Sequence, residues 1–201
     1  MSEHVVRPAR ADDTAAVAPL LYESATGMYD RFAGGPARAL DVIEAAVEEP
    51  GNNASLEIVT VAELDGTIAG AMAAFPVEEA GLRARAFMRL TLRKLPFWRW
   101  PAALRLYWAG GRAAPAPPEG SLYVDALAVA EDARRHGVGL ALLAGAEDEA
   151  RARGLDIVSL DTSLANKPAR ALYLDAGFEE VAYRPPARGL PGFVALVKPV
   201  S

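Results

Sequence analysis

The chain has 201 residues, 52% of them hydrophobic, which suits a single domain with a sizeable core over residues 1–201. The absence of cysteine excludes disulfides, thiolate zinc sites and a cysteine nucleophile, and with only two histidines we expect no metal site. The net charge of −5 gives no general case for nucleic-acid binding, so we expect no nucleic-acid partner.

The N-terminal segment, residues 1–10, carries charges and lacks the apolar core of a signal peptide. The sequence has no run of about 20 apolar residues, so we expect no transmembrane helix. We expect a cytoplasmic protein. His4 to Pro8 are expected to form the first strand. Asp12 or Asp13 is expected to cap the next helix, which we expect to continue through residues 22–32.

The next part of the chain alternates between helix breakers and regular elements. Gly34-Gly35 is expected to end the first helical region, and residues 37–48 are expected to form a further helix. Residues 56–64 and 67–75 are rich in β-forming side chains and are joined by Asp65-Gly66. That dipeptide is a strong signal for a two-residue turn, so we predict a β-hairpin.

Residues 80–118 differ from the rest of the chain. They contain eight arginine and lysine residues, no acidic residue and all three tryptophans, and they end in a stiff proline-rich linker. We expect a basic, aromatic helical insert, and we favour a lid over the acceptor cleft or a contact with a second subunit. The alternatives are contact with an anionic membrane surface and nucleic-acid binding; the negative overall charge counts against both.

An apolar strand is expected over residues 121–129, followed by Arg134-Arg135-His136-Gly137-Val138-Gly139 and a helix over residues 140–153. Glycine lets a ligand approach the backbone, and the free amides and positive dipole of a helix start favour phosphate. The two arginines can add charge-assisted contacts. We therefore expect a pyrophosphate cradle. The alternative is a tight structural turn, because Gly-x-Gly alone lacks the dinucleotide fingerprint and the P-loop ending.

The last part of the chain is expected to complete the sheet. We expect strands over residues 156–162, 178–183 and 192–198. Between the first two, residues 167–176 are expected to form a short helix with Gly177 as its C-terminal cap. We find no internal repeat and no domain boundary in the sequence.

Two motifs resemble those of the GCN5-related N-acetyltransferase (GNAT) superfamily. The first is an apolar strand end, Leu127-Ala128-Val129, followed by Arg134-x-x-Gly137-x-Gly139, which is similar to the acyl-CoA-binding motif. The second runs from Asn166 through Tyr173 to Gly177-Phe178. The resemblance covers nearly all of the chain except residues 80–118. It implies an α/β fold with a mixed, mostly antiparallel sheet flanked by helices.

The resemblance also implies acetyl-CoA as a co-substrate. The residues expected to contact it are Leu127, Ala128, Val129, Arg134, Arg135, Gly137, Val138, Gly139, Leu140, Asn166 and Tyr173. Leu127 and Val129 are expected to act through backbone groups, because fixed N–H donors stabilise developing oxyanion charge. Their alternative role is ordinary core packing. Asn166 has the alternative role of an N-cap for the helix that follows it.

Tyr173 matches the superfamily tyrosine that protonates the departing CoA thiolate. A phenol with a pKa of about 10 can act as a general acid, given suitable geometry. The alternative is a helix tyrosine that only packs against the sheet.

Asp125 is the candidate base, acting directly or through water. Strand alternation is expected to place it on one face with Tyr123, Leu127 and Val129. An aspartate within an apolar strand needs a reason, because burying a charge is costly. Burial would have to raise its pKa for efficient proton removal. The alternatives are a salt bridge with an arginine of the basic insert, and Asp161 as the base.

We therefore expect direct transfer of an acetyl group from acetyl-CoA to a primary amine, with a small-molecule acceptor favoured. The alternatives are acetylation of a protein or peptide amine, and a non-catalytic acyl-CoA-binding regulatory module. Members of the superfamily often pair, so the resemblance admits a homodimer. The sequence does not identify the amine.

Overall fold

The computed structural model describes residues 4–111, 113–187 and 191–200, and its centre is a seven-stranded sheet of order β1-β2-β3-β4-β5-β7-β6. The strands are β1 (His4–Pro8), β2 (Val59–Leu64), β3 (Thr67–Pro76), β4 (Ser121–Val129), β5 (Ile157–Ser163), β6 (Glu179–Arg184) and β7 (Phe193–Pro199). β4 and β5 are parallel and the other neighbouring pairs are antiparallel. The sheet is therefore mixed and mostly antiparallel, as the sequence predicted.

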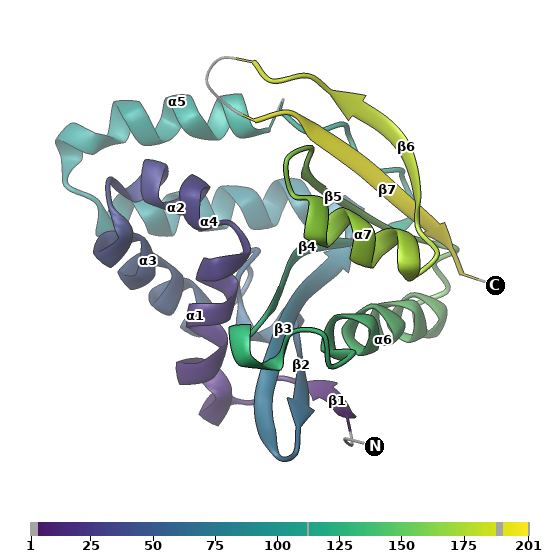
Figure 1. The fold of residues 1–201 in the computed structure, drawn as a ribbon. Helices are drawn as coiled ribbons and strands as arrows, with labels where there is room; N and C mark the ends of the chain where they lie inside the picture. The colour runs from purple at the N-terminus through teal and green to yellow at the C-terminus, as the bar shows by residue number, and fades with distance from the viewer. Residues whose placement is uncertain (1–3, 112, 188–190, 201) are drawn as a thin grey trace.

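Helices cover both faces of this sheet (Figure 1). They are α1 (Thr14–Ser24), α2 (Thr26–Ala33), α3 (Pro36–Glu48), α4 (Ala80–Lys94), α5 (Trp100–Gly110), α6 (Val138–Ala152) and α7 (Lys167–Asp175). In Figure 1, α1 to α5 gather on the left of the sheet, and α6 and α7 lie on the right. Side chains of α1, α3 and α4 share one buried core with the sheet, and those of α6 and α7 share another.

The hairpin between β2 and β3 is confirmed. Leu64 pairs with Thr67, and the two residues between them have positive φ angles, 51° at Asp65 and 80° at Gly66. Positive φ at both central residues is the geometry of the type I′ turn that matches the twist of paired strands. β2 begins at Val59, later than expected, because the residues before it form a 3₁₀ turn.

The first helical region differs from the prediction in two ways. A 3₁₀ turn precedes α1, and Asp13 does not cap α1 with its side chain. Its carboxylate instead accepts hydrogen bonds from the Arg10 amide at 2.6 Å and from the Arg7 guanidinium at 2.6 and 3.0 Å. The helix is also interrupted at Ala25, whose φ of −146° is not helical, so α1 and α2 are separate.

Within residues 80–118 the structure contains two helices, α4 and α5. Leu90 of α4 is only 2% exposed and belongs to the core beneath α1 and α3. α4 is therefore part of the main body, so the expectation of a lid can apply only to α5. α5 packs on α2, and its fully buried Ala103 belongs to the same apolar cluster as Ala33 of α2. No helix in the described ranges is both long and apolar enough to cross a membrane.

Candidate active site

The sheet opens between β4 and β5. Their parallel pairing runs from Ser121 with Ile157 to Val124 with Leu160. At the paired end the hydroxyls of Ser121 and Ser159 are hydrogen-bonded at 2.7 Å. Beyond Val124, β4 continues to its end without register partners in β5. The second half of β4 therefore has an edge whose backbone groups are free of ladder bonds to β5.

A β-bulge lies at the point where this pairing ends. On the other side of β4, Ala74 of β3 pairs with Val124 and Ala73 pairs with Ala126. Asp125 is the extra residue between these two pairs. Bulges re-aim side chains and are frequent beside active sites.

The bulge reverses the alternation of side chains along β4. The core that contains α6 receives Leu122, Val124, Leu127 and Val129, and the core that contains α1 receives Ala126 and Ala128. The prediction that Tyr123 shares a face with Leu127 and Val129 is therefore wrong. Strict alternation holds only while both strands advance by one residue per pair, and the unpaired Asp125 breaks that rule.

Asp125 is held by an amide rather than by a cation. The Asn53 side-chain nitrogen donates to its carboxylate at 3.0 Å. Burial, followed by the negative charge of Asp161, raises the pKa of Asp125 from 3.8 to about 7, against a smaller lowering by the Asn53 bond. The expected alternative, an ion pair with an insert arginine, is not found among the described residues. Arg83, for example, pairs with Glu57 and Glu79 instead.

A second buried carboxyl lies near the first. The Tyr123 hydroxyl donates to Asp161 at 2.6 Å, which links β4 to β5. Burial raises the pKa of Asp161, and the bond from Tyr123 offsets part of that rise. Burial and the nearby charges of Asp161 and Asp125 also raise the pKa of Tyr123 well above its ordinary value. Tyr123 therefore remains a hydrogen-bond donor at neutral pH.

Tyr173 of α7 lies on the same acidic cluster. It is 7% exposed, and its ring is 6.2 Å from that of Phe178. Burial, followed by the charge of Asp161, raises the pKa of Tyr173 to about 12. Within residues 4–111, 113–187 and 191–200, no protein group accepts or donates a hydrogen bond at its hydroxyl. Tyr173 therefore keeps its proton and has a hydroxyl that is not committed to the fold.

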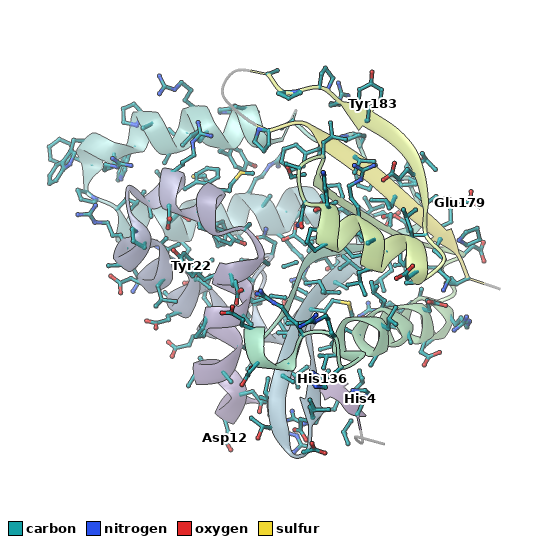
Figure 2. The ribbon with its side chains drawn as sticks, in the orientation of Figure 1. His4, Asp12, Tyr22, His136, Glu179 and Tyr183 are labelled. Atoms are coloured by element: carbon teal, nitrogen blue, oxygen red, sulfur yellow. The ribbon has the colours of Figure 1, made fainter. Side chains whose placement is uncertain are left out.

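The predicted cradle forms a tight start to α6. Arg135 and Gly137 have positive φ angles of 64° and 84°, and Gly137 precedes the first helical residue, Val138. A Cβ atom added to Gly139 would lie 2.9 Å from Leu172 of α7, so this glycine permits close packing of the two helices. Figure 2 shows the exposed His136 at this start of α6. The helix begins at Val138, two residues earlier than predicted. Its first backbone amides have no partners within the helix and face the loop that precedes it.

The side chains around the cradle have different roles in the fold. Arg134 forms an ion pair with Glu23 of α1 and donates to the Val129 carbonyl oxygen at 3.2 Å. Arg135 is exposed, whereas Val138 is 1% exposed and can offer a ligand only its backbone. Leu140, one turn into the helix, is half exposed.

Asn166 is the N-cap of α7, the alternative role considered for it in the sequence. Its side-chain oxygen accepts from the Ala169 amide at 3.3 Å, and its nitrogen donates to the Thr162 hydroxyl at 3.3 Å. The first bond satisfies a free amide at the start of α7. Its amide therefore already has partners on both sides before any ligand arrives.

The structure brings Asp125 and Tyr173 to one acidic cluster, with Asp161 and Tyr123 between β4 and β5. Ala128 points into the opposite core from its neighbours in the predicted acetyl-CoA set. Sequence reasoning missed Asn53, which lies 72 residues from its partner Asp125. Its buried side-chain oxygen has no hydrogen-bond partner in the described part of the chain. No group of three or more His, Cys, Asp or Glu suited to a metal is found in that part either.

The comparisons with known proteins agree with this architecture. Residues 30–178 match the family model described as "Acetyltransferase (GNAT) family". A segment of 54 residues is 48% identical to the aminoglycoside N(6')-acetyltransferase type 1 of Klebsiella aerogenes. That segment is 27% of this chain and 36% of the Klebsiella protein, so the match spans about a third of its length.

Two solved structures have the same overall fold. An N-acetyltransferase from Staphylococcus aureus Mu50 superposes with a TM-score of 0.75 and 19% identity, covering 96% of this chain and all of that chain. A protein described only as an acetyltransferase superposes with a TM-score of 0.70 and 20% identity, covering 98% of this chain and all of that one. At such low identity the likeness concerns the fold alone.

Proposed function

The chain belongs to the acetyltransferase (GNAT) family, and on that premise we propose that it transfers an acetyl group from acetyl-CoA to the primary amine of a small molecule. The observation that carries the proposal is the position of Asp125. It lies on a bulge where β4 and β5 part, has a pKa of about 7, and has an amide as its bonded partner. A general base is most effective when its pKa lies near the working pH.

The donor would be held by the unpaired edge of β4 and the start of α6. The backbone of Leu127 and Val129 would hold the pantetheine arm and polarise the thioester carbonyl. The amides from Gly137 to Leu140 would bind the pyrophosphate, helped by the positive end of the helix dipole. The exposed Arg135 adds a cation there, while Arg134 would first have to leave Glu23.

The reaction would proceed within one complex of enzyme, donor and amine. Asp125 takes a proton from the substrate ammonium, and the free amine attacks the thioester carbon. A C–N bond forms and gives a tetrahedral intermediate. As this intermediate collapses, the nitrogen releases its second proton to solvent, the C–S bond breaks, and the sulfur leaves as CoA thiolate. Tyr173 would donate a hydrogen bond, and then its proton, to that sulfur, and Tyr173 and Asp125 would return to their starting protonation states by exchange with solvent.

The pKa of Tyr173 bears on the last step. At about 12 it exceeds the ordinary thiol value of about 8.5, so proton transfer to a thiolate is unfavourable in the resting protein. The charge of Asp161 is one cause of that high value. A cationic amine, or the protonated nitrogen of the tetrahedral intermediate, would offset this charge when it lies beside Asp161, and would lower the pKa of Tyr173. Binding of the acceptor would thus make Tyr173 a stronger acid.

The small-molecule acceptor is supported by two observations. The Klebsiella relative is named for an aminoglycoside, a small compound that carries amines. The buried carboxyls of Asp125 and Asp161 also have neutral hydrogen-bond partners, Asn53 and Tyr123, so they favour a cationic acceptor. The amine itself is left to experiment.

Thermal unfolding with increasing acetyl-CoA is the first test. A ligand that binds only the native state raises the melting temperature as its concentration rises. We expect a saturable rise, followed by thiol release when a panel of small amines and peptides is added. No rise at millimolar acetyl-CoA would contradict the donor site, and release with peptides alone would contradict the small-molecule acceptor.

A further inference from the structure

An apolar surface on α5 and the turn before it is unused by the proposed reaction. We call it the aromatic face, and it consists of Phe97, Trp98, Trp100, Leu104 and Trp108, which are 74%, 67%, 43%, 37% and 62% exposed. The last three are four residues apart and form one stripe along the helix. In Figure 1, α5 lies at the upper left edge of the molecule, above α2 and α4. α5 and the turn before it therefore expose several large apolar side chains, a feature that marks binding surfaces.

The three tryptophans of this face differ in how they are held. The Trp100 indole nitrogen donates to the carbonyl oxygens of Leu92 at 3.0 Å and Leu95 at 3.3 Å, which fixes that ring against the end of α4. No acceptor for the indole nitrogens of Trp98 and Trp108 is found in the described part of the chain. These two rings offer an apolar body with a free polar edge, the combination that is enriched at the water interface of membranes.

The charge around the face is positive. Residues 80–118 hold eight arginines and lysines and no acidic residue, in a chain whose net charge is −5. Some are neutralised by the body of the protein, as Arg93 is by Glu49. Lys94 and Arg105 are exposed and have no ion-pair partner in the described ranges. Lys94 is the last residue of α4, just before the turn that carries Phe97 and Trp98, and Arg105 follows Leu104 on α5.

We propose that the aromatic face docks the protein on an anionic lipid membrane, with α5 lying in the headgroup plane. Such a surface would bury the apolar stripe and neutralise Lys94 and Arg105 at the same time. A helix of 11 residues is about 16 Å long, which suits contact in the plane of the surface rather than passage across it.

A second copy of the chain fits this face less well. A two-fold contact would place the same face against itself. The cations of both copies would then meet without an acidic residue from residues 80–118 to neutralise them. Like charges placed together oppose association. An anionic bilayer supplies the missing charge, and a second copy does not.

The tryptophans give a direct readout, because all three in the chain belong to this face. Full-length protein would be titrated with vesicles of phosphatidylcholine and phosphatidylserine, and separately with pure phosphatidylcholine. We expect a blue shift of the intrinsic fluorescence and co-sedimentation with the anionic vesicles only, both weakened by salt.

Two double variants test the assignment independently. Trp98→Ser with Trp108→Ser should lower the partition coefficient, followed by co-sedimentation, by about tenfold or more. Lys94→Glu with Arg105→Glu should lower it by at least about 25-fold, since each cation near an anionic surface contributes about fivefold.

Matched controls are Val5→Ser with Leu174→Ser, and Arg10→Glu with Lys167→Glu, all at exposed positions outside α4 and α5. They should bind as the wild type does. Circular dichroism checks that each variant folds, and the two test pairs do not depend on each other. Absence of binding to anionic vesicles, or equal losses in tests and controls, would overturn the proposal. So would sedimentation showing that Trp98 and Trp108 hold two copies together while vesicles leave the protein unbound.

Discussion

Replacing Asp125 by asparagine keeps the size of the side chain and leaves an oxygen to accept the hydrogen bond from Asn53. It removes a carboxyl whose pKa is about 7 in the folded protein and 3.8 in the unfolded chain. Between these values the folded protein retains a proton that the unfolded chain has released. The associated stability is fully present below pH 3.8 and is lost as the pH rises through about 7.

The size of the effect follows from the shift. About three pKa units correspond to at most about 4 kcal/mol, and about two of them lie between pH 5 and 7, which gives about 3 kcal/mol. Asparagine does not titrate in this range. The free energy of unfolding of Asp125→Asn, relative to wild type, should therefore increase by up to about 3 kcal/mol between pH 5 and pH 8.

Urea unfolding of both proteins across this pH range measures the difference, and equal m-values would show that the two transitions are comparable. The assay needs no acceptor substrate, so it tests the environment of Asp125 apart from the proposed reaction. A difference that does not change between pH 5 and pH 8 would refute the reasoning. Once an acceptor is known, wild-type kcat/KM should rise with pH, with an apparent pKa of about 7. The variant should not show this rise.

Three further changes give separate expectations. Asp13→Asn should change the pH dependence of stability in the opposite direction, because the hydrogen bonds from Arg7 lower the pKa of Asp13. The variant should be less stable than wild type by about 1–3 kcal/mol at pH 7, and urea unfolding should show this difference disappearing as the pH falls below 3.8. Tyr173→Phe should keep the thermal shift with acetyl-CoA but lower kcat by about 10²-fold or more, while the exposed control Tyr183→Phe keeps both; equal turnover would remove Tyr173 from the mechanism. Gly137→Ala should cost about 1–2 kcal/mol, since alanine is strained at a φ of 84°, and should weaken the acetyl-CoA thermal shift; unchanged unfolding and binding would contradict a role for this turn.

Much of the local structure could be predicted from the sequence, because short-range chemistry determines it. Asp65-Gly66 is one of the few dipeptides that accept positive φ at both turn positions, and the hairpin forms there. Gly177, with a φ of 87°, follows α7 as the predicted cap. β4 was predicted with its observed bounds, residues 121–129, and α6 to within two residues of its start. The spacing of the two motifs was sufficient to indicate the GNAT fold.

The candidate site depended on contacts that no local pattern contains. The bulge at Asp125 arises from the register of β4 against β3, so alternation along β4 alone assigned the wrong faces. Asn53 reaches Asp125 across 72 residues of chain, and the raised pKa of Asp125 comes from burial and from Asp161 on another strand. Residue types and spacings along the chain therefore determined the elements and their order. Only the tertiary structure decided which side chains share an environment, because desolvation and charge interactions depend on distance in space rather than on separation in sequence.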